Sequence, residues 1–294
     1  MPLMDQRLAD VLTLLDLEPL EVNLFRGASR DIGSPQVFGG QVLGQALVAA
    51  YRTVDARACH SLHAYFLRRG DFNAPIVYQV DRSLDGHSFS NRRVVAIQHG
   101  EQIFHMSCSF QVAESGLDHS AAMPEVPPPE QLRDFDSYHE ELLAELPEKV
   151  RRFFEHRRPF EFRPVRDPNY VNPVPLPPAK QVWFRAVDRV PTDDDWAHRC
   201  LLAYVSDYNL LDTALLPHAA SFAHLQLASI DHAMWFHRSF RADEWLLYVV
   251  DSPSAAAARG FARGSIFTRD GRLVASTAQE GLIRLRTTAY TNPP

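Results

Sequence analysis

The chain has 294 residues, of which 46% are hydrophobic and 22% are charged. This is enough apolar material for one large core or two cores of moderate size. The net charge is −6 at pH 7, and the basic residues are scattered apart from four arginines between residues 151 and 158, so nucleic acid is not an expected partner.

The N-terminal segment predicts an amphipathic first helix. Residues 1–20, MPLMDQRLADVLTLLDLEPL, place acidic residues among leucines, unlike the basic start and unbroken apolar run of a secretory signal peptide. No run of about 18 apolar residues occurs, so no membrane span is expected. The cysteines Cys59, Cys108 and Cys200 are odd in number and widely separated, which predicts neither a disulfide framework nor a metal site and favours a cytoplasmic location.

A first central helix is predicted over residues 38–54, FGGQVLGQALVAAYRTV. Apolar residues cover most of its circumference, and only Gln41, Gln45 and Arg52 form a polar edge. Such a helix is buried, and its alanines allow a covering sheet to approach closely. Strand-like segments separated by turn signals predict that sheet as an antiparallel meander, at residues 61–67, 76–83, 88–98 and 102–112.

The middle of the chain changes in composition. From residue 123 to residue 178, prolines lie on both sides of a charged helical pattern that runs from Ser137 to about His156. We therefore expect residues 116–178 to form a linker that is partly ordered on the surface.

The second half repeats the plan of the first. Its predicted elements are a strand at 181–187, a second central helix at 199–216, and strands at 226–236, 244–252, 260–268 and 273–283. Phe66 and Tyr78 align with Phe236 and Tyr248 at an offset of 170 (236 − 66 and 248 − 78). A repeat of this length indicates a duplicated domain.

These elements predict an α+β protein with the double hot-dog fold, in which two tandem antiparallel sheets each wrap round a long central helix. We expect an N-terminal hot-dog over residues 1–115, the linker over 116–178, and a C-terminal hot-dog over 179–290. A crevice at the seam between the halves would suit an elongated apolar ligand.

Asp207 is the first candidate for chemistry because it lies among leucines and tyrosines of the second central helix. A buried carboxylate without partners costs several kcal/mol. Asp207 must therefore have partners, either as a reacting group or as a structural aspartate bonded to backbone amides.

Three further side chains are weaker candidates. Ser229 and His232 lie on the strand at 226–236, where alternation places them on opposite faces, and either could be structural. Gln279 lies among small residues in ASTAQEG, as it would if its side chain faced a cavity. His60 and His63 also fall on opposite faces, so they are poor joint metal ligands.

Several familiar catalytic motifs are absent from the sequence. It contains no G-x-S-x-G nucleophile elbow, no P-loop, no H-E-x-x-H and no G-x-G-x-x-G. A covalent serine hydrolase and a nucleotide-dependent enzyme are therefore disfavoured.

From about Leu12 to Arg284, the chain resembles the type II acyl-CoA thioesterases, the TesB-like double hot-dog hydrolases. The stretches that carry this resemblance are LFRG (24–27), VFGGQVLGQAL (37–47), HSLHAYFLR (60–68), DGHSFSNRRV (85–94), SDYNLL (206–211), IDHAMWFHR (230–238), EWLLY (244–248), ARGFARG (258–264) and ASTAQEG (275–281). The resemblance implies an enzyme of fatty acid metabolism that hydrolyses medium- to long-chain fatty acyl-CoA to free fatty acid and CoA. It implies no metal and no organic cofactor.

The family's Asp, Ser or Thr, and Gln fall by motif on Asp207, Ser229 and Gln279, and His60 is a possible additional site residue. The implied roles are a general base for Asp207 and positioning of a water for the other two. Backbone N–H groups near the start of a central helix would bind the oxyanion. The arginines considered for the CoA phosphates are Arg68, Arg92, Arg259 and Arg263.

Two other functions are open to this fold. One is a hot-dog enoyl-CoA hydratase, but those enzymes resemble one another in an Asp-x-Asn-Pro-aliphatic-His run, and here Leu210 follows Asn209 and Asp212 stands in place of the histidine. A non-catalytic acyl-CoA-binding module would be favoured by loss of one of the three site residues, and all three are present. Exposed sheet edges favour a homo-oligomer, either a dimer or a tetramer of double hot-dogs.

Overall fold

The computed structural model describes residues 4–286, apart from residues 139–140, 142, 145, 147, 169 and 171. Its helices are α1 (Gln6–Leu15), α2 (Gly39–Tyr51), α4 (Glu148–Glu155) and α5 (Asp195–Ser206), with short 3-10 helices η1 (Pro129–Gln131), η2 (Phe135–Tyr138), η3 (Leu211–His218) and η4 (Phe222–His224). In the N-terminal half the strands are β1 (Glu18–Glu21), β2 (Leu24–Gly27), β3 (Ala58–Phe66), β4 (Ile76–Asp85), β5 (Phe89–Gln98) and β6 (Glu101–Gln111). The second half adds β7 (Phe160–Pro164), β8 (Ala179–Ala186), β9 (Leu225–Ser229), β10 (Asp231–Phe236), β11 (Leu246–Ala256), β12 (Arg259–Thr268) and β13 (Leu273–Leu285).

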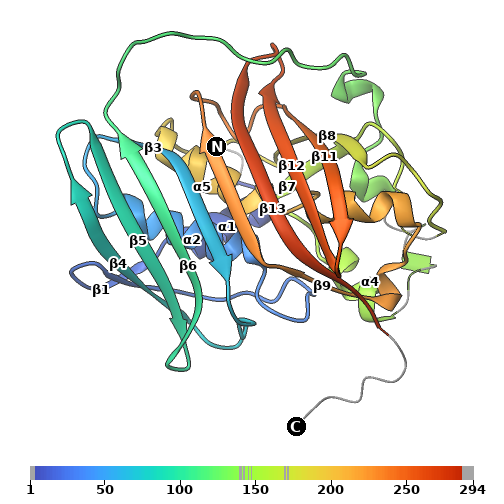
Figure 1. The fold of residues 1–294 in the computed structure, drawn as a ribbon, viewed down its shortest axis with the longest axis horizontal. Helices are drawn as coiled ribbons and strands as arrows, with labels where there is room; N and C mark the ends of the chain where they lie inside the picture. Colours follow the sequence, from blue (N-terminus) through green and yellow to red (C-terminus); the bar gives the residue numbers. More distant parts are fainter. Residues whose placement is uncertain are drawn as a thin grey trace.

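The described strands form one antiparallel sheet that curls round α2 and α5 (Figure 1). Its order is β1-β2-β4-β5-β6-β3-β10-β13-β12-β11-β8-β7, and β9 also pairs with β13. The two halves meet where β3 pairs with β10, with Ser61 opposite Trp235 and Tyr65 opposite Asp231. This arrangement confirms the predicted tandem hot-dog fold.

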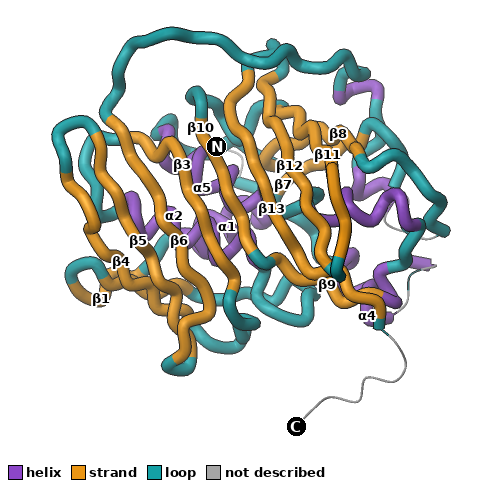
Figure 2. The backbone as a smooth tube through the Cα atoms, in the orientation of Figure 1, coloured by secondary structure: helices purple, strands orange, loops and turns teal. Residues whose placement is uncertain are grey.

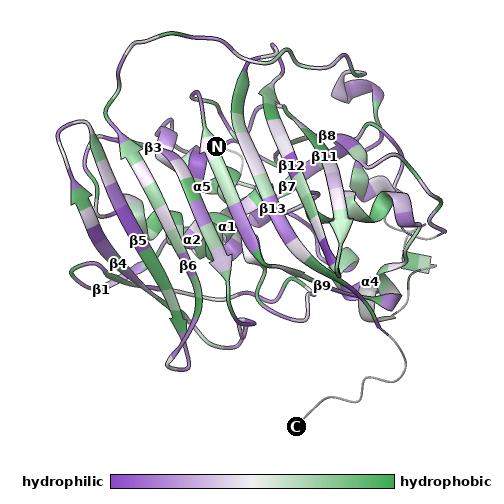
Figure 3. Cartoon of the chain, in the orientation of Figure 1, coloured by the Kyte–Doolittle hydropathy of each residue, from purple (hydrophilic) through white to green (hydrophobic). Residues whose placement is uncertain are grey.

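The sheet strands show the alternation that a half-buried sheet requires. In β5, for example, Ser90, Arg92, Val94 and Ala96 are buried, while the residues between them are half-buried or exposed. Both hydrophilic and hydrophobic residues are present along the strands (Figure 3). The buried positions face the two central helices.

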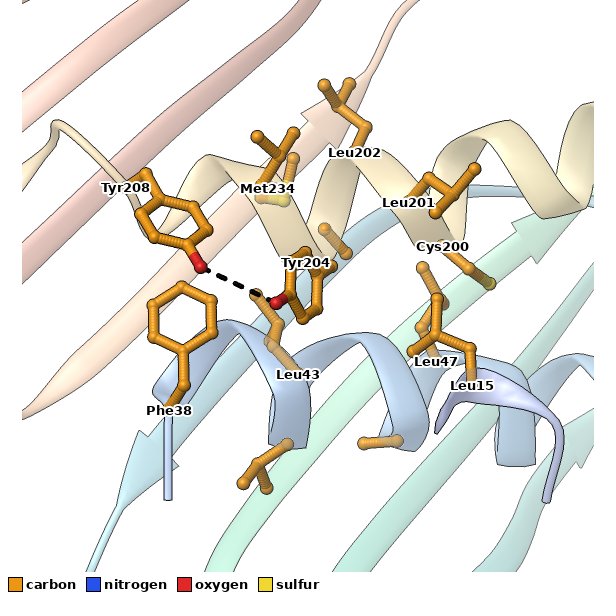
Figure 4. Packing of buried hydrophobic residues seen from close by; sticks show 14 of the residues in the cluster. Leu15, Phe38, Leu43, Leu47, Cys200, Leu201, Leu202, Tyr204, Tyr208 and Met234 are labelled. Carbon is orange, nitrogen blue, oxygen red and sulfur yellow. Dashed lines mark hydrogen bonds between the residues drawn. The ribbon is translucent and has the colours of Figure 1, made fainter. Parts of the chain in front are cut away.

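The central helices α2 and α5 pack closely against each other in the middle of the core. Leu43 and Leu47 of α2 lie next to Leu201 and Tyr204 of α5 (Figure 4). A Cβ atom on Gly40 would lie 2.1 Å from the carbonyl oxygen of Tyr204, so only glycine permits this approach.

Two predicted elements differ from the observed ones. The second central helix ends at Ser206 and does not continue to residue 216, because Asn209 has a φ of 65° and a 3-10 helix follows from Leu211. The strand predicted over residues 226–236 is divided at Ile230 into β9 and β10. Both differences place candidate site residues where regular elements end.

The segment between the two halves contains a loop, buried residues and a strand. Residues 112–128 have no regular secondary structure and run along one edge of the molecule (Figure 2). After them, Phe135 and Phe154 are buried, and β7 pairs with β8 at the end of the sheet. The predicted helical pattern from residue 137 to residue 156 corresponds in part to α4, and part of it lies outside the described residues.

Candidate active site

Asp207 lies directly after the last residue of α5, where it faces the first turn of α2. Its side chain is 8% exposed, and its Oδ2 atom accepts a hydrogen bond from the backbone N–H of Gly40 at 3.0 Å. A Cβ atom on Gly39 would lie 2.7 Å from the same Oδ2 atom, so the carboxylate occupies space that any larger residue would take. The Gly-Gly pair therefore admits the carboxylate to the start of α2.

Ser229 and Gln279 complete a hydrogen-bonded group with Asp207. The Gln279 Nε2 atom lies 2.7 Å from Asp207 Oδ1 and 3.1 Å from Ser229 Oγ. The Ser229 hydroxyl donates to Asp207 Oδ1 at 3.3 Å. Residues from the end of α5, the end of β9 and the middle of β13 are thus brought together, as the sequence motifs predicted.

A β-bulge places Ser229 and His232 on the same side of the sheet. From Ser229 to Ala233 the chain advances four residues, whereas its partner β13 advances three, from Gly281 to Ala278. The extra residue is Ile230, whose N–H and carbonyl bond to Glu280 and Phe66 of the two flanking strands. Simple alternation predicted opposite faces for Ser229 and His232, and this prediction is wrong because the bulge shifts the alternation by one residue.

His232 is fully buried and fixes the orientation of the Gln279 amide. Its Nε2 atom lies 3.0 Å from Ser206 Oγ, and its Nδ1 atom lies 3.2 Å from Gln279 Nε2. Because the Ser206 hydroxyl donates to the Ala203 carbonyl, the imidazole Nε2–H donates to Ser206 and Nδ1 accepts from Gln279. Burial lowers the pKa of His232 far below its usual value, which keeps the ring neutral and Nδ1 free to accept.

The Gln279 amide therefore faces acceptors on two sides. Both Asp207 Oδ1 and His232 Nδ1 require the nitrogen end of the amide, because the oxygen end would oppose two lone-pair acceptors. Gln279 is completely buried, and its Oε1 atom has no hydrogen-bond partner in the described part of the chain. On sequence alone His232 is one of the weaker candidates and could equally be structural, and its position in IDHAMWFHR near Ser229 is the usable signal.

His60 lies apart from this group. Its Nε2 atom contacts Ser109 Oγ at 2.9 Å, and its ring lines a separate crevice at the other end of the helix pair. Within the described residues, no hydrogen bond joins it to Asp207, Ser229 or Gln279. Of the residues that the family resemblance indicates, the structure thus brings Asp207, Ser229 and Gln279 together and places His60 elsewhere.

A crevice of about 160 Å³ opens beside Ser229 and Gly39. Its walls include the apolar side chains of Val37, Val42, Phe66 and Ile103, and the two arginines Arg68 and Arg69 lie at the same crevice. Both arginines are exposed, and Arg68 pairs with Glu101 at 3.0 Å.

The other arginines considered for phosphate binding have different surroundings. Arg92 is fully buried and bonds to Thr53, Leu84 and Asp85, so its guanidinium group is used inside the protein. Arg259 and Arg263 form exposed ion pairs with Glu280 and Asp251. Of the four, only Arg68 lines the crevice beside the candidate site.

Within the described residues, neither a metal-ligand cluster nor a membrane-spanning helix is found. No group of three or more His, Cys, Asp or Glu side chains there is arranged to hold a metal ion. No helix in that part of the chain combines the length and the apolar character needed to cross a membrane.

Comparison with known proteins gives consistent matches along the chain. The family model described as "Acyl-CoA thioesterase" matches residues 151–282, and the one described as "Acyl-CoA thioesterase N-terminal domain" matches residues 27–111. "Acyl-coenzyme A thioesterase 8" from Homo sapiens is 42% identical over 296 residues, covering 96% of this chain and 91% of the human protein. "Acyl-CoA thioesterase 2" from Haemophilus influenzae is 43% identical over 284 residues, covering 96% of this chain and 99% of that protein. The crystal structure of acyl-CoA thioesterase II TesB2 from Mycobacterium marinum is similar with a TM-score of 0.78 and 46% identity, covering 96% of this chain and 100% of that chain.

Proposed function

Since the chain belongs to the acyl-CoA thioesterase II (TesB-like) family and is an acyl-CoA thioester hydrolase, we propose that Asp207 is the general base of its reaction. The observation that carries this proposal is the donor set around the carboxylate. The Gly40 N–H donates to Oδ2, while the Gln279 amide and the Ser229 hydroxyl donate to Oδ1. A carboxylate fixed in this way can accept a proton from a water that attacks the thioester carbon, an effect typically worth about 10² to 10⁴ in rate.

Ser229 and Gln279 position the attacking water next to Asp207. Both side chains donate to Asp207 Oδ1, and Gln279 Nε2 lies 3.1 Å from Ser229 Oγ, so their polar atoms surround one oxygen of the base. His232 holds the Gln279 amide with its nitrogen toward Asp207. These contacts favour a single orientation of the water before attack, which reduces the entropic part of the barrier.

The start of α2 supplies the donor for the developing oxyanion. The Gly40 N–H is already bonded to Asp207, whereas the Gly39 N–H finds no acceptor among the described residues. The first N–H groups of a helix carry partial positive charge, so Gly39 can stabilise negative charge on the thioester oxygen. The CoA thiol has an ordinary thiol pKa, so the thiolate leaves without a strong general acid.

The substrates are medium- to long-chain fatty acyl-CoA thioesters. The apolar walls of the crevice beside Ser229, formed by Val37, Val42 and Phe66, suit an acyl chain. Arg68 and Arg69 at the same crevice suit the phosphates of CoA.

Mass spectrometry of the enzyme quenched in acid during turnover tests direct attack by water. We expect no acyl adduct on the protein and, in H₂¹⁸O, one ¹⁸O atom in the released fatty acid. An acyl adduct on Ser229 or Asp207 would contradict the proposal, because it would make that residue the nucleophile.

We also propose that the protein self-associates and that it is cytoplasmic. Tyr65 and Trp235 lie on the two strands that join the halves and are 50% and 37% exposed, which gives the outer face of the sheet an apolar area that a second copy could cover. Light scattering should give at least twice the monomer mass of 33.3 kDa. A monomeric mass would contradict the proposed self-association.

A further inference from the structure

The two halves of the sheet are related by a pseudo-twofold axis. Adding 170 to residues of β3, β4 and β5 gives their counterparts in the second half, so that the pair Tyr78–Ala96 corresponds to Tyr248–Ile266 (248 − 78 and 266 − 96). At the junction, the pair Ser61–Trp235 corresponds to Asp231–Tyr65, which is the same junction read in the opposite direction. The axis therefore passes through the middle of the β3–β10 pair.

This axis relates the crevice beside Ser229 to a second crevice. Phe66, Arg68 and Ala228 line the first, and their counterparts at the same offset, Phe236, Arg238 and Ala58, line the second. The second crevice is much larger, at about 1050 Å³. It is therefore the pseudo-symmetric counterpart of the entrance to the active site.

The second crevice lacks the groups that the proposed hydrolysis uses. Cys59 is the counterpart of Ser229. Cys108 of β6 is the counterpart of Gln279 of β13, because Cys108 lies opposite a residue of β5 and Gln279 lies opposite the corresponding residue of β12. Tyr51, at the end of α2, contacts the Cys59 backbone N–H. Burial raises the pKa of the Cys59 thiol to about 12, so it is neutral and unreactive.

The lining of the second crevice suits a phosphorylated nucleotide. The guanidinium group of Arg57 is held by Ser90 Oγ and by the carbonyl oxygens of Gly86 and His87, and no carboxylate pairs with it among the described residues. Its positive charge is thus oriented and not neutralised, as phosphate binding requires. Arg52 and Arg199 line the same crevice, each paired with a carboxylate at 2.5 Å.

Trp196 provides an aromatic face at the same crevice. Its side chain is 43% exposed, and its ring lies 6.2 Å from that of Tyr51, between centroids. A base can stack on such a ring, and the crevice carboxylates Asp194 and Glu114 can accept hydrogen bonds from an amino group. Arginine charge, an aromatic face and carboxylates together match an adenine nucleotide better than a fatty acid, which needs apolar walls.

We propose that this second crevice binds the nucleotide part of CoA without hydrolysing a thioester. The proposal rests on the proposed function in one respect, because CoA is the product of the reaction assigned to Asp207. It predicts two CoA sites per chain, of which one is catalytic. The second site would hold CoA next to α5, the helix whose end carries Asp207.

Calorimetric titration with CoA, together with tryptophan fluorescence, tests this proposal. Wild type should bind two CoA per chain and show quenching of Trp196. The double variant Arg57→Gln/Trp196→Leu should bind one CoA, or bind the second at least tenfold more weakly, and should still hydrolyse acyl-CoA at the wild-type rate under saturating substrate. The control Trp235→Leu removes an exposed tryptophan from the outer face of the sheet and should keep both sites.

Two results would overturn the second site. One is a single CoA per chain in wild type, and the other is two sites that survive in the double variant. The single variant Trp196→Leu gives a second test if the double variant does not fold, since retained hydrolysis shows that it is folded. Failure of hydrolysis in wild type would instead count against the proposed function. The number of CoA sites per chain could still be measured in that case.

Discussion

The amide nitrogen of Gln279 lies 2.7 Å from Oδ1 of Asp207, although the two residues are 72 positions apart in the sequence. This contact joins β13 to the end of α5. The Nδ1 atom of a third residue, His232, accepts a hydrogen bond from the same nitrogen. The proposed base is therefore oriented by a side chain that is itself held in place.

Replacement of Gln279 with alanine should lower kcat more than it raises KM. The substitution removes the donor nearest Asp207 Oδ1 and leaves the carboxylate held by Gly40 and Ser229 alone. We expect kcat to fall by about 10-fold to 100-fold, as for other losses of positioning. Steady-state kinetics of thiol release measure both constants, and a change confined to KM would assign Gln279 to substrate binding.

Replacement of Ser229 separates the hydroxyl from the rest of the side chain. Ser229→Thr keeps the donor to Asp207, so it should retain kcat within a few-fold, whereas Ser229→Ala should lower kcat by at least about 10-fold. The threonine variant is the matched control, because it keeps the serine hydroxyl and adds one methyl group. Equal rates for the two variants would show that the hydroxyl has no part in the reaction.

His232 should make stability depend on pH. Its pKa is lowered in the folded protein relative to the ordinary value of 6.5, so the unfolded chain binds more protons below that pH. Its contribution to stability is complete above about pH 6.5 and is lost as the pH falls toward the lowered pKa. Between pH 7.5 and pH 5.5, urea unfolding of wild type should lose up to about 1.4 kcal/mol more than His232→Asn. Identical pH dependence in both proteins would show that folding does not lower the pKa of His232.

Gly40→Ala should destabilise the fold and displace the base. The added Cβ would lie 2.1 Å from the Tyr204 carbonyl oxygen, and the Gly40 N–H is a donor to Asp207. Overpacking of this kind typically costs about 1 to 3 kcal/mol. Gly116→Ala is the control, because no atom lies within 4 Å of its added Cβ. Denaturation midpoints that coincide for the two variants would contradict the close approach of α2 and α5.

The strands and the duplication could be predicted from the sequence, because both depend on local patterns. Strand-like segments separated by turn signals located the meanders, and the 170-residue offset of Phe66 and Tyr78 matches the register of the two half-sheets. The first central helix was also predictable, since its apolar circumference extends over α2. The short strands β1, β2 and β7 at the two ends of the sheet were missed, since each has only four or five residues.

The geometry of the site could not be predicted from local patterns. The end of α5 at Ser206 and the bulge at Ile230 both depend on partners far along the chain. The contact between Gly40 and Asp207 spans 167 positions. The motif resemblance pointed to Asp207, Ser229 and Gln279 without these details. The role of His232 could be assigned only from the structure, because it depends on the contacts of its two ring nitrogens with Ser206 and Gln279.

The most direct test of the central claim is release of CoA thiol from medium-chain and long-chain acyl-CoA by wild type and Asp207→Asn, measured side by side with a colorimetric thiol reagent. The variant keeps the shape of the side chain and loses the base. We predict turnover in wild type and a fall in kcat of about 100-fold or more in the variant, with acyl-CoA binding retained. Near-normal turnover in a folded Asp207→Asn protein would contradict the assignment of Asp207 as the general base.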